Sequence, residues 1–269
     1  MGDYSQAAEF YDLLYAATKN YAAESAIVAQ LIRAAAPTAR RVLDVGCGTG
    51  KHAEALTALR FEVDGVDLEP AFVAMASTRC PTRTFWVGDM TRLAVPHRYD
   101  AIVCLFSAIG YAYTLELLQQ TLNGMAAHLE PDGVVIIDPW FEPGQLTDRW
   151  ISIVSGSAEG TGVCRLSRTL IEGAVSRLEF EYLIGTPDGI ERRSERHSLG
   201  LFTREQMKSA FEEAGLSVEW KDAALRRRGA YVGQFALSRN ERSSGRRGTW
   251  RETAAHDGIP TTRANGDSD

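Results

Sequence analysis

The sequence has few cysteines, no long apolar run and no excess of positive charge. Its cysteines, Cys47, Cys80, Cys104 and Cys164, are widely spaced, and no two have the spacing of a zinc site, so we expect no metal. No apolar stretch approaches the roughly 20 residues that span a bilayer. The N-terminus lacks the basic and apolar regions of a secretory signal. These absences predict a cytoplasmic protein with reduced thiols.

The net charge is −6 at pH 7. An acidic chain has no general attraction to nucleic acid or to an anionic membrane, and we expect neither as a partner. A local basic run, residues 226–228, is either a phosphate-binding group or a solvated surface. With 269 residues, 45% of them hydrophobic, the chain suits one large globular domain with or without an inserted lobe. The sequence leaves a homodimer open.

Strand-like and helical segments alternate over the first ~140 residues, which predicts a doubly wound α/β fold with a mostly parallel sheet. The expected strands are 41–45, 62–68, 84–87, 99–106 and 134–138, and the expected helices are 21–36, 52–59, 71–79 and 115–129. Residues 216–220 and 230–238 are expected to complete a seven-stranded sheet as an antiparallel pair. In such sheets the functional loops lie at the carboxyl ends of the strands.

Residues 151–200 have a different pattern, with alternating apolar and polar side chains at 161–169, 176–184 and 192–201. This pattern predicts an antiparallel insert. A helix follows from Thr203 to Ala214, with a capping box formed by Thr203 and Gln206. From about Asn240 the composition becomes polar and rich in Gly, Ser, Thr and Arg, which is typical of a disordered tail.

The segment VLDVGCGTGKH, residues 42–52, ends the first expected strand in a glycine-rich loop. A phosphate-binding P-loop requires GxxxxGK followed by Ser or Thr, but Val45 and His52 stand at the first and last of those positions. A dinucleotide-binding loop has the spacing GxGxxG, whereas this loop has GxGxG. Both alternatives are therefore disfavoured.

A ligand with an amino-acid end and a nucleoside end fits this loop better. Asp44 can accept hydrogen bonds from an ammonium group, and the glycine amides allow close approach. Asp67, after the second strand, can bind ribose hydroxyls. Asp89, after the third strand, can bind an adenine amine beside the apolar Met90. Three acids at three consecutive strand ends favour a single site.

These segments resemble the class I S-adenosylmethionine-dependent methyltransferases. LDVGCGTG, VDGVDLEP, VGDM and YDAIVCLF are similar to four successive motifs of that family. The resemblance implies a Rossmann-like fold and S-adenosylmethionine as the cofactor. It implies that the methionine end is held by Asp44, Gly46, Cys47, Gly48 and Gly50. It implies that the adenosine end is held by Asp67, Leu68, Asp89 and Met90, with Leu105 and Ser107 bordering the cofactor.

A longer resemblance, across residues 3–235, is to the bacterial sugar-nucleotide N,N-dimethyltransferases of macrolide biosynthesis. It is carried by DYSQAAEFYD, KNYAAESA, SAIGY, EPDGVVIIDPW, RSERHSLGLFTREQ and RRGAYVG. It implies that Tyr4 lies near the substrate amine, that Tyr11 and Tyr21 line the cleft, and that Arg228 binds the nucleotide diphosphate. The sequence departs from the family at Tyr111, where a histidine is usual, and at Arg226 and Arg227, where a serine-glycine pair is usual.

The residue patterns and the resemblance together divide the chain into five parts. It comprises an N-terminal helical lid (1–36), a cofactor-binding core (37–150), an antiparallel substrate lobe (151–202), a completion of the core sheet (203–239) and a tail (240–269). We expect Tyr4 and Tyr111 to position the amine, because methyl transfer from a sulfonium needs alignment more than a strong base. Trp140 and His197 are candidate substrate contacts.

The sequence therefore predicts a methyltransferase that acts on the amine of a small molecule, with an aminosugar nucleotide as the leading substrate. Two alternatives stay open at this point. One is O- or C-methyl transfer to another secondary metabolite, which the Tyr111 departure favours. The other is a cofactor-binding module without catalysis.

Overall fold

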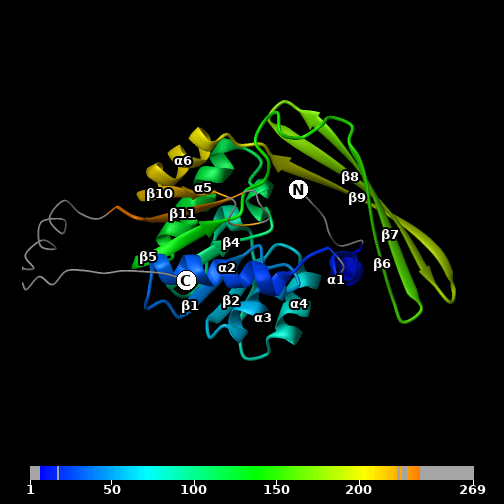
Figure 1. The fold of residues 1–269 in the computed structure, drawn as a ribbon, viewed down its shortest axis with the longest axis horizontal. Helices are drawn as coiled ribbons and strands as arrows, with labels where there is room; N and C mark the ends of the chain where they lie inside the picture. The colour runs from blue at the N-terminus through cyan, green and yellow to red at the C-terminus, as the bar shows by residue number, and fades with distance from the viewer. Residues whose placement is uncertain (1–6, 17, 223–224, 226–228, 237–269) are drawn as a thin grey trace, which may run out of the picture. The chain divides into compact units, whose positions relative to one another are not determined.

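The computed structural model describes residues 7–16, 18–222, 225 and 229–236. Its centre is a seven-stranded sheet with the strand order β10-β11-β5-β4-β1-β2-β3 (Figure 1). The parallel strands are β1 (Arg41–Val45), β2 (Glu62–Asp67), β3 (Phe85–Val87), β4 (Tyr99–Cys104) and β5 (Leu129–Ile137). The antiparallel pair is β10 (Leu216–Lys221) and β11 (Ala230–Phe235). The predicted α/β sheet, including its closing pair, is confirmed.

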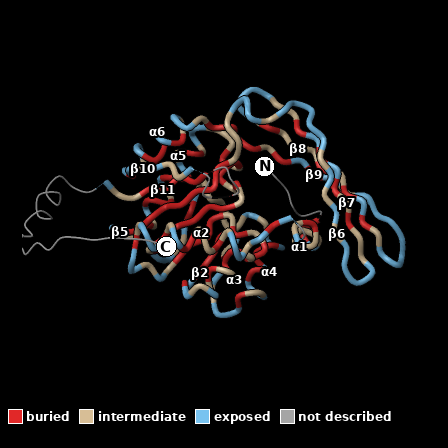
Figure 2. Tube along the Cα trace, viewed as in Figure 1, coloured by how far each residue is buried: buried red, intermediate tan, exposed pale blue. Residues whose placement is uncertain are grey.

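Helices cover both faces of this sheet. Neighbouring residues of β1 show the two faces, because Val42 packs in the core with α2, α3 and α4, and Leu43 packs in the core with α5 and α6. The helices are α2 (Tyr21–Ala35), α3 (Lys51–Ala58), α4 (Pro70–Arg79), α5 (Leu115–Ala127) and α6 (Arg204–Glu213). Figure 2 shows the buried strands between the two helical layers. Among the described residues, no helix has both the length and the apolar character needed to cross a bilayer.

The boundary between α5 and β5 differs from the expectation. The helix ends at Ala127 rather than at residue 129, and the strand begins at Leu129 rather than at residue 134. Leu129 pairs with Tyr99, and after a register shift Val134 pairs with Ala101. The strand therefore accommodates the turn-like segment 130–133 as an irregularity, which a turn signal in the sequence does not reveal.

A second sheet consists of four antiparallel strands in the order β6-β7-β8-β9. They are β6 (Ile151–Ala158), β7 (Thr161–Glu172), β8 (Val175–Thr186) and β9 (Gly189–Gly200). The sequence did not indicate β6 as a separate strand. Its large apolar residues Ile151 and Ile153 are exposed, so the pattern that normally marks a buried strand face is reversed.

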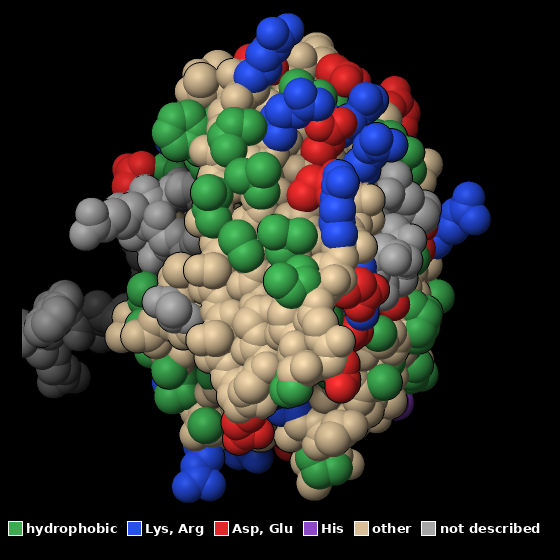
Figure 3. Space-filling model, turned by 90° about the vertical axis from the view of Figure 1, so that its right-hand side faces the viewer, with side chains coloured by type: hydrophobic (Ala, Val, Ile, Leu, Met, Phe, Trp, Pro, Cys, Tyr) green, Lys and Arg blue, Asp and Glu red, His purple; other side chains and the backbone are tan. Residues whose placement is uncertain are grey.

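The two faces of this second sheet have different chemistry. Exposed apolar residues lie on the outer face, among them Ile153, Leu166 and Leu183. Ion pairs lie beside them, such as Arg168 with Glu179 at 2.5 Å. Figure 3 shows hydrophobic side chains beside basic and acidic ones on one surface of the molecule. The inner face is buried and forms the wall of the site described below.

Two short N-terminal helices, η1 (Ala8–Phe10) and α1 (Tyr11–Tyr15), pack against the second sheet. Leu14 is 1% exposed and shares a small core with Val163 and Tyr182. A Cβ atom at Gly156 of β6 would lie 2.3 Å from the backbone oxygen of Leu13. The glycine therefore permits α1 to lie directly on the strand.

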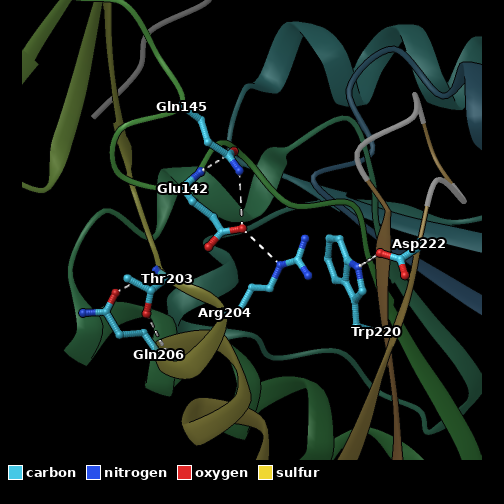
Figure 4. A network of polar contacts seen from close by, with 7 residues as sticks. All are labelled: Glu142, Gln145, Thr203, Arg204, Gln206, Trp220 and Asp222. Carbon is cyan, nitrogen blue, oxygen red and sulfur yellow. Dashed lines mark hydrogen bonds and ion pairs between the residues drawn. The ribbon is translucent and has the colours of Figure 1, made fainter.

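The loop after β5 is fastened to α6. Glu142 accepts a hydrogen bond from Arg204 at 3.1 Å, and the Arg204 guanidinium lies 4.3 Å from the ring centroid of Trp220. Thr203 and Gln206 form the predicted capping box of α6. Figure 4 shows these contacts around the start of the helix, with Glu142 between Gln145 and Arg204, and Thr203 beside Gln206.

Candidate active site

Three glycines shape the loop after β1. Gly46, Gly48 and Gly50 have φ angles of 75°, 53° and 79°, which other residues rarely adopt. The amides of Gly46 and Cys47 donate to the Val66 oxygen at 2.8 and 3.1 Å. These bonds fix the loop against β2 at the carboxyl ends of the parallel strands.

The Gly48 amide donates to Asp67 Oδ2 at 2.7 Å, and the Glu69 amide donates to Oδ1 at 2.9 Å. Burial raises the pKa of Asp67, and these hydrogen bonds oppose the rise. A carboxylate oxygen can accept more than one hydrogen bond, so Asp67 can also accept from a ligand. Asp67, at the end of β2, thus holds the glycine loop at the end of β1, and its carboxylate can bind a pair of hydroxyls.

Asp44 is the most unusual acid of the site. It is 1% exposed, and neither of its carboxylate oxygens has a hydrogen-bond partner among the described residues. Burial and the nearby Asp67 charge raise the pKa of Asp44 to about 7, and the Lys19 cation opposes that rise. A buried, unpaired carboxylate is costly, so the site is suited to a bound cationic group.

Beside Asp44 lies a cluster of ionisable side chains from α2 and α3. Glu24 accepts from Lys19 at 2.6 Å and lies 3.1 Å from His52 Nε2. Burial opposes ionisation of Glu24, but the bonds to His52 and Lys19 prevail and lower its pKa to about 2. Tyr21 packs its ring on His52, with centroids 4.9 Å apart, and burial raises the pKa of Tyr21. The cluster thus joins the start of α2 to the start of α3.

A cavity of about 710 Å³ opens at the carboxyl ends of the strands. This volume is typical of small-molecule sites. Eleven residues that the sequence marked as site candidates line it: Tyr11, Gly46, Gly48, Asp67, Leu68, Asp89, Met90, Leu105, Ser107, Tyr111 and Trp140. Tyr21, Asp44, Cys47, Gly50 and His197 are not among its lining residues.

The loops after β3 and β4 supply the next part of the wall. Asp89 accepts from the amide and hydroxyl of Thr91 at 2.9 and 2.8 Å, at the start of η2 (Met90–Arg92). Phe106 and Ser107 both have positive φ angles, 54° and 65°, before η3 (Ala108–Tyr111). Two consecutive residues of this kind are strained, and strain of this type concentrates at functional loops.

Aromatic rings from α1 close one side of the cavity. Tyr11 lies 5.0 Å from Phe72, and Tyr15 lies 5.1 Å from Phe106, centroid to centroid. The sequence identified Tyr11 but not Tyr15, although a spacing of four residues places both on one side of a helix. Together these rings join the N-terminal helix to the core around the cavity.

The inner face of the second sheet closes the adjoining side. Arg165 is 6% exposed and lies between two rings, 4.3 Å from the Phe180 centroid and 5.3 Å from that of Tyr15. It also donates to the Tyr15 hydroxyl at 2.9 Å. The sequence analysis missed Arg165. The sequence does contain a sign of its position. Arg165 comes two residues after the buried Val163 on a strand with alternating burial, so both side chains lie on the same face of the sheet.

Trp140 and Tyr111 lie where the two sheets meet. Trp140 Nε1 donates to the Ser176 hydroxyl at 2.8 Å, which ties the loop after β5 to β8. The Tyr111 hydroxyl lies 3.2 Å from His197 Nδ1. His197 is fully buried, so the structure brings it to Tyr111 rather than to the cavity surface. Tyr4 and Arg228 lie outside the described residues.

Comparison with known proteins gives matching results from sequence and structure. A family described as "Methyltransferase domain" matches residues 42–133. The chain is 39% identical to the dTDP-3-amino-3,6-dideoxy-alpha-D-glucopyranose N,N-dimethyltransferase of Streptomyces fradiae, over 86% of this chain and 92% of that protein.

Two solved structures share the fold and much of the sequence. DesVI of Streptomyces venezuelae has a TM-score of 0.80 and 36% identity, over 85% of this chain and 98% of that chain. CalS10, an amino pentose methyltransferase of Micromonospora echinaspora solved with S-adenosylmethionine bound, has a TM-score of 0.75 and 37% identity, over 84% of this chain and 96% of that chain.

Proposed function

The chain belongs to the S-adenosylmethionine-dependent methyltransferases, in the group of dTDP-aminosugar N,N-dimethyltransferases, and on this premise we propose that it methylates the amine of a dTDP-linked aminosugar. S-adenosylmethionine is its cofactor, as the bound cofactor of CalS10 and the matched family indicate. The observation that carries the substrate proposal is a single cavity that extends from the glycine loop to the inner face of the second sheet.

The residues of the core fit the cofactor. The unpaired, buried carboxylate of Asp44 is suited to an ammonium group, and the oriented carboxylate of Asp67 is suited to ribose hydroxyls. Asp89 and Met90 offer an acceptor and an apolar surface to a purine. When bound, S-adenosylmethionine supplies a methyl group on a positively charged sulfur.

The other half of the cavity fits a sugar nucleotide. Among the described lining residues on the second sheet, Arg165 carries a positive charge, and the hydroxyls of Ser152, Ser167 and Thr169 lie on the same wall. A buried guanidinium held between Tyr15 and Phe180 is suited to a phosphate oxygen, and hydroxyls are suited to a sugar. This combination supports a substrate that carries both groups.

Methyl transfer to an amine requires alignment of the nucleophile and exclusion of water. Tyr111 places a hydroxyl in the cavity wall, and Trp140 and Phe141 supply an aromatic surface beside it. We assign Tyr111 to orienting the amine. Tyr4 and Arg228 remain proposed contacts of the amine and of the diphosphate, and Tyr11, Tyr21, Cys47 and Leu68 remain proposed cofactor contacts.

The test is turnover of S-adenosylmethionine with dTDP-3-amino-3,6-dideoxyglucose, followed by mass spectrometry of the sugar nucleotide. We expect products that carry one and two added methyl groups. The matched control is the same sugar nucleotide with a hydroxyl in place of the amine, which we expect to be inert. Methylation of the hydroxyl compound alone would instead support O-methyl transfer, and no turnover of either would overturn the substrate proposal.

A further inference from the structure

A chain of buried polar groups runs from the cavity wall into the second sheet. The Tyr111 hydroxyl, at the end of η3, lies 3.2 Å from Nδ1 of His197 on β9. Nε2 of the same imidazole lies 3.4 Å from Oε2 of Glu195. His197 and Glu195 are 0% and 5% exposed, so water does not compete for these contacts.

The other partners of Glu195 identify it as an acceptor. The Tyr182 hydroxyl donates to Oε2 at 2.7 Å, and the Ala7 amide donates to Oε1 at 3.1 Å. Because a carboxylate of this kind offers lone pairs, the His197 nitrogen that faces it carries the proton. In the neutral imidazole the proton is then on Nε2, and Nδ1 is the nitrogen without a proton.

The tautomer determines the direction of the hydrogen bond to Tyr111. With Nδ1 unprotonated, the Tyr111 hydroxyl must donate to it. The Tyr111 proton is therefore directed into the second sheet, and the oxygen offers only lone pairs to the cavity.

We propose that His197 and Glu195 are positioning residues that hold Tyr111 as a hydrogen-bond acceptor for the substrate amine. This inference rests on the proposed amine substrate. A tyrosine hydroxyl that donated to the amine would occupy the nitrogen lone pair that attacks the methyl group. A hydroxyl that accepts an amine N–H leaves this lone pair available and directs it. His197 acts through Tyr111 and not by touching the sugar, which differs from the direct contact expected from the sequence.

The chain also reaches the N-terminal segment. Glu195 holds both the imidazole and the Ala7 amide, which is immediately before η1. The orientation of Tyr111 thus depends on the same carboxylate that fastens the N-terminal helices to the second sheet.

The first test requires no substrate. Nitrogen-15 NMR of histidine-labelled protein, with His197 assigned by the His197→Asn variant, reports the tautomer in mildly alkaline buffer. We expect the Nε2–H form, and we expect Tyr111→Phe to shift the Nδ1 resonance. An Nδ1–H imidazole would overturn the proposal whatever the activity of the enzyme, whereas absent turnover with the expected tautomer would count only against the proposed substrate.

The second test is a double-mutant cycle on turnover. We expect His197→Leu to lower kcat on the order of 10- to 100-fold, the range of loss for a misplaced reacting group, with KM for S-adenosylmethionine unchanged. In a Tyr111→Phe background the same change should cause no further loss, because the two residues act as a unit. The asparagine of His197→Asn can place its amide oxygen near the position of Nδ1 and accept from the Tyr111 hydroxyl. This variant should therefore recover part of kcat.

Additive losses in this cycle, or equal losses for His197→Leu and His197→Asn, would contradict the proposal. Glu195→Gln tests the third member, since an amide can turn its NH₂ group toward Nε2 and favour the other tautomer. Tyr99→Phe is the matched structural control, because Tyr99 is also a buried tyrosine that donates to a buried carboxylate, Asp64, at 3.2 Å, outside the cavity. It should lower the melting temperature without changing kcat.

Discussion

The Asp12 carboxylate of α1 accepts a hydrogen bond from the Thr49 hydroxyl of the glycine loop at 2.6 Å. Its second oxygen pairs with Arg79 at the end of α4, at 2.5 Å. The Arg79 guanidinium also donates to the Thr49 backbone oxygen. These contacts fasten the helix that carries Tyr11 and Tyr15 to the loop that precedes α3, on the cofactor side of the cavity.

We predict that Asp12→Asn weakens binding of S-adenosylhomocysteine ~5- to 10-fold, equivalent to the loss of one ordinary hydrogen bond of about 1 kcal/mol. Without the ion pair, α1 and its aromatic residues close the cavity less completely. Titration calorimetry provides the measurement. Glu212→Gln, which breaks an exposed pair with Lys208, is the control and should not alter binding. Equal affinities for Asp12→Asn and the unchanged chain would exclude the fastening role.

Asp44→Asn should stabilise the ligand-free chain but weaken ligand binding. Because the pKa of Asp44 in the folded chain is raised from 3.8 to about 7, ionising it destabilises the ligand-free fold. The free energy of unfolding should fall as pH rises from about 4 to about 7, and Asp44→Asn should remove this fall. At pH above 7 the variant should therefore melt at a higher temperature than the unchanged chain.

The same substitution should weaken S-adenosylhomocysteine binding ~10- to 100-fold, because the ammonium loses a charged acceptor. In the unchanged chain, affinity should increase as pH rises through about 7, where Asp44 ionises. Asp64→Asn is the control, since Asp64 is buried but pairs with Arg83 at 3.1 Å. It should lose stability instead of gaining it. Calorimetry across this pH range measures the affinity for S-adenosylhomocysteine. An affinity that did not change with pH would contradict the assignment of Asp44.

Arg165→Met should raise KM for the sugar nucleotide ~10- to 100-fold, through loss of a charge-assisted contact to phosphate. Affinity for S-adenosylhomocysteine should change less than this KM, because Arg165 contacts Tyr15 and Phe180 rather than the glycine loop. Arg168→Met is the matched control, since Arg168 is on the same strand but on the outer face, paired with Glu179. Equal effects of the two substitutions on KM would remove Arg165 from the substrate site.

Glu24→Gln should destabilise the chain by about 2–3 kcal/mol near neutral pH, because it leaves the Lys19 cation buried without its carboxylate. The pKa of Glu24 is lowered from 4.5 to about 2, so its contribution is complete above pH 4.5 and is lost as pH falls toward 2. Denaturant unfolding of both proteins across this range should show the difference in unfolding free energy shrinking with acidity. A difference that stayed constant would rule out the charge as its source.

Local sequence patterns were sufficient to predict the core sheet and the strand ends at which the cavity opens. Gly46, Gly48 and Asp67 are close in the sequence to the strand ends that position them, so their meeting follows from the order of strands. The isolation of Asp44 could not be predicted, because it depends on how many donors reach a buried carboxylate from the whole fold.

The substrate half was harder to predict because it depends on register between distant strands. Which side chains face inward on the second sheet depends on which residues of β6 and β7 pair. The sequence did not reveal β6 as a strand, because its isoleucines are exposed. Arg165 and Glu195 reach N-terminal residues more than a hundred positions away. Nothing in the local sequence reports such contacts, although the alternation of Glu195 and His197 shows that they share one face.

The ion pair between Glu142 and Arg204 joins the point where the chain leaves the core to the point where it returns. Everything between these two residues, including all four strands of the second sheet, is one uninterrupted stretch of chain. Exchanging this single stretch between related enzymes would therefore replace most of one wall of the cavity and leave the glycine loop and its acids intact. On the proposed assignment of the two halves of the cavity, acceptor choice and methyl-donor binding can in this way diverge independently through recombination at two neighbouring positions.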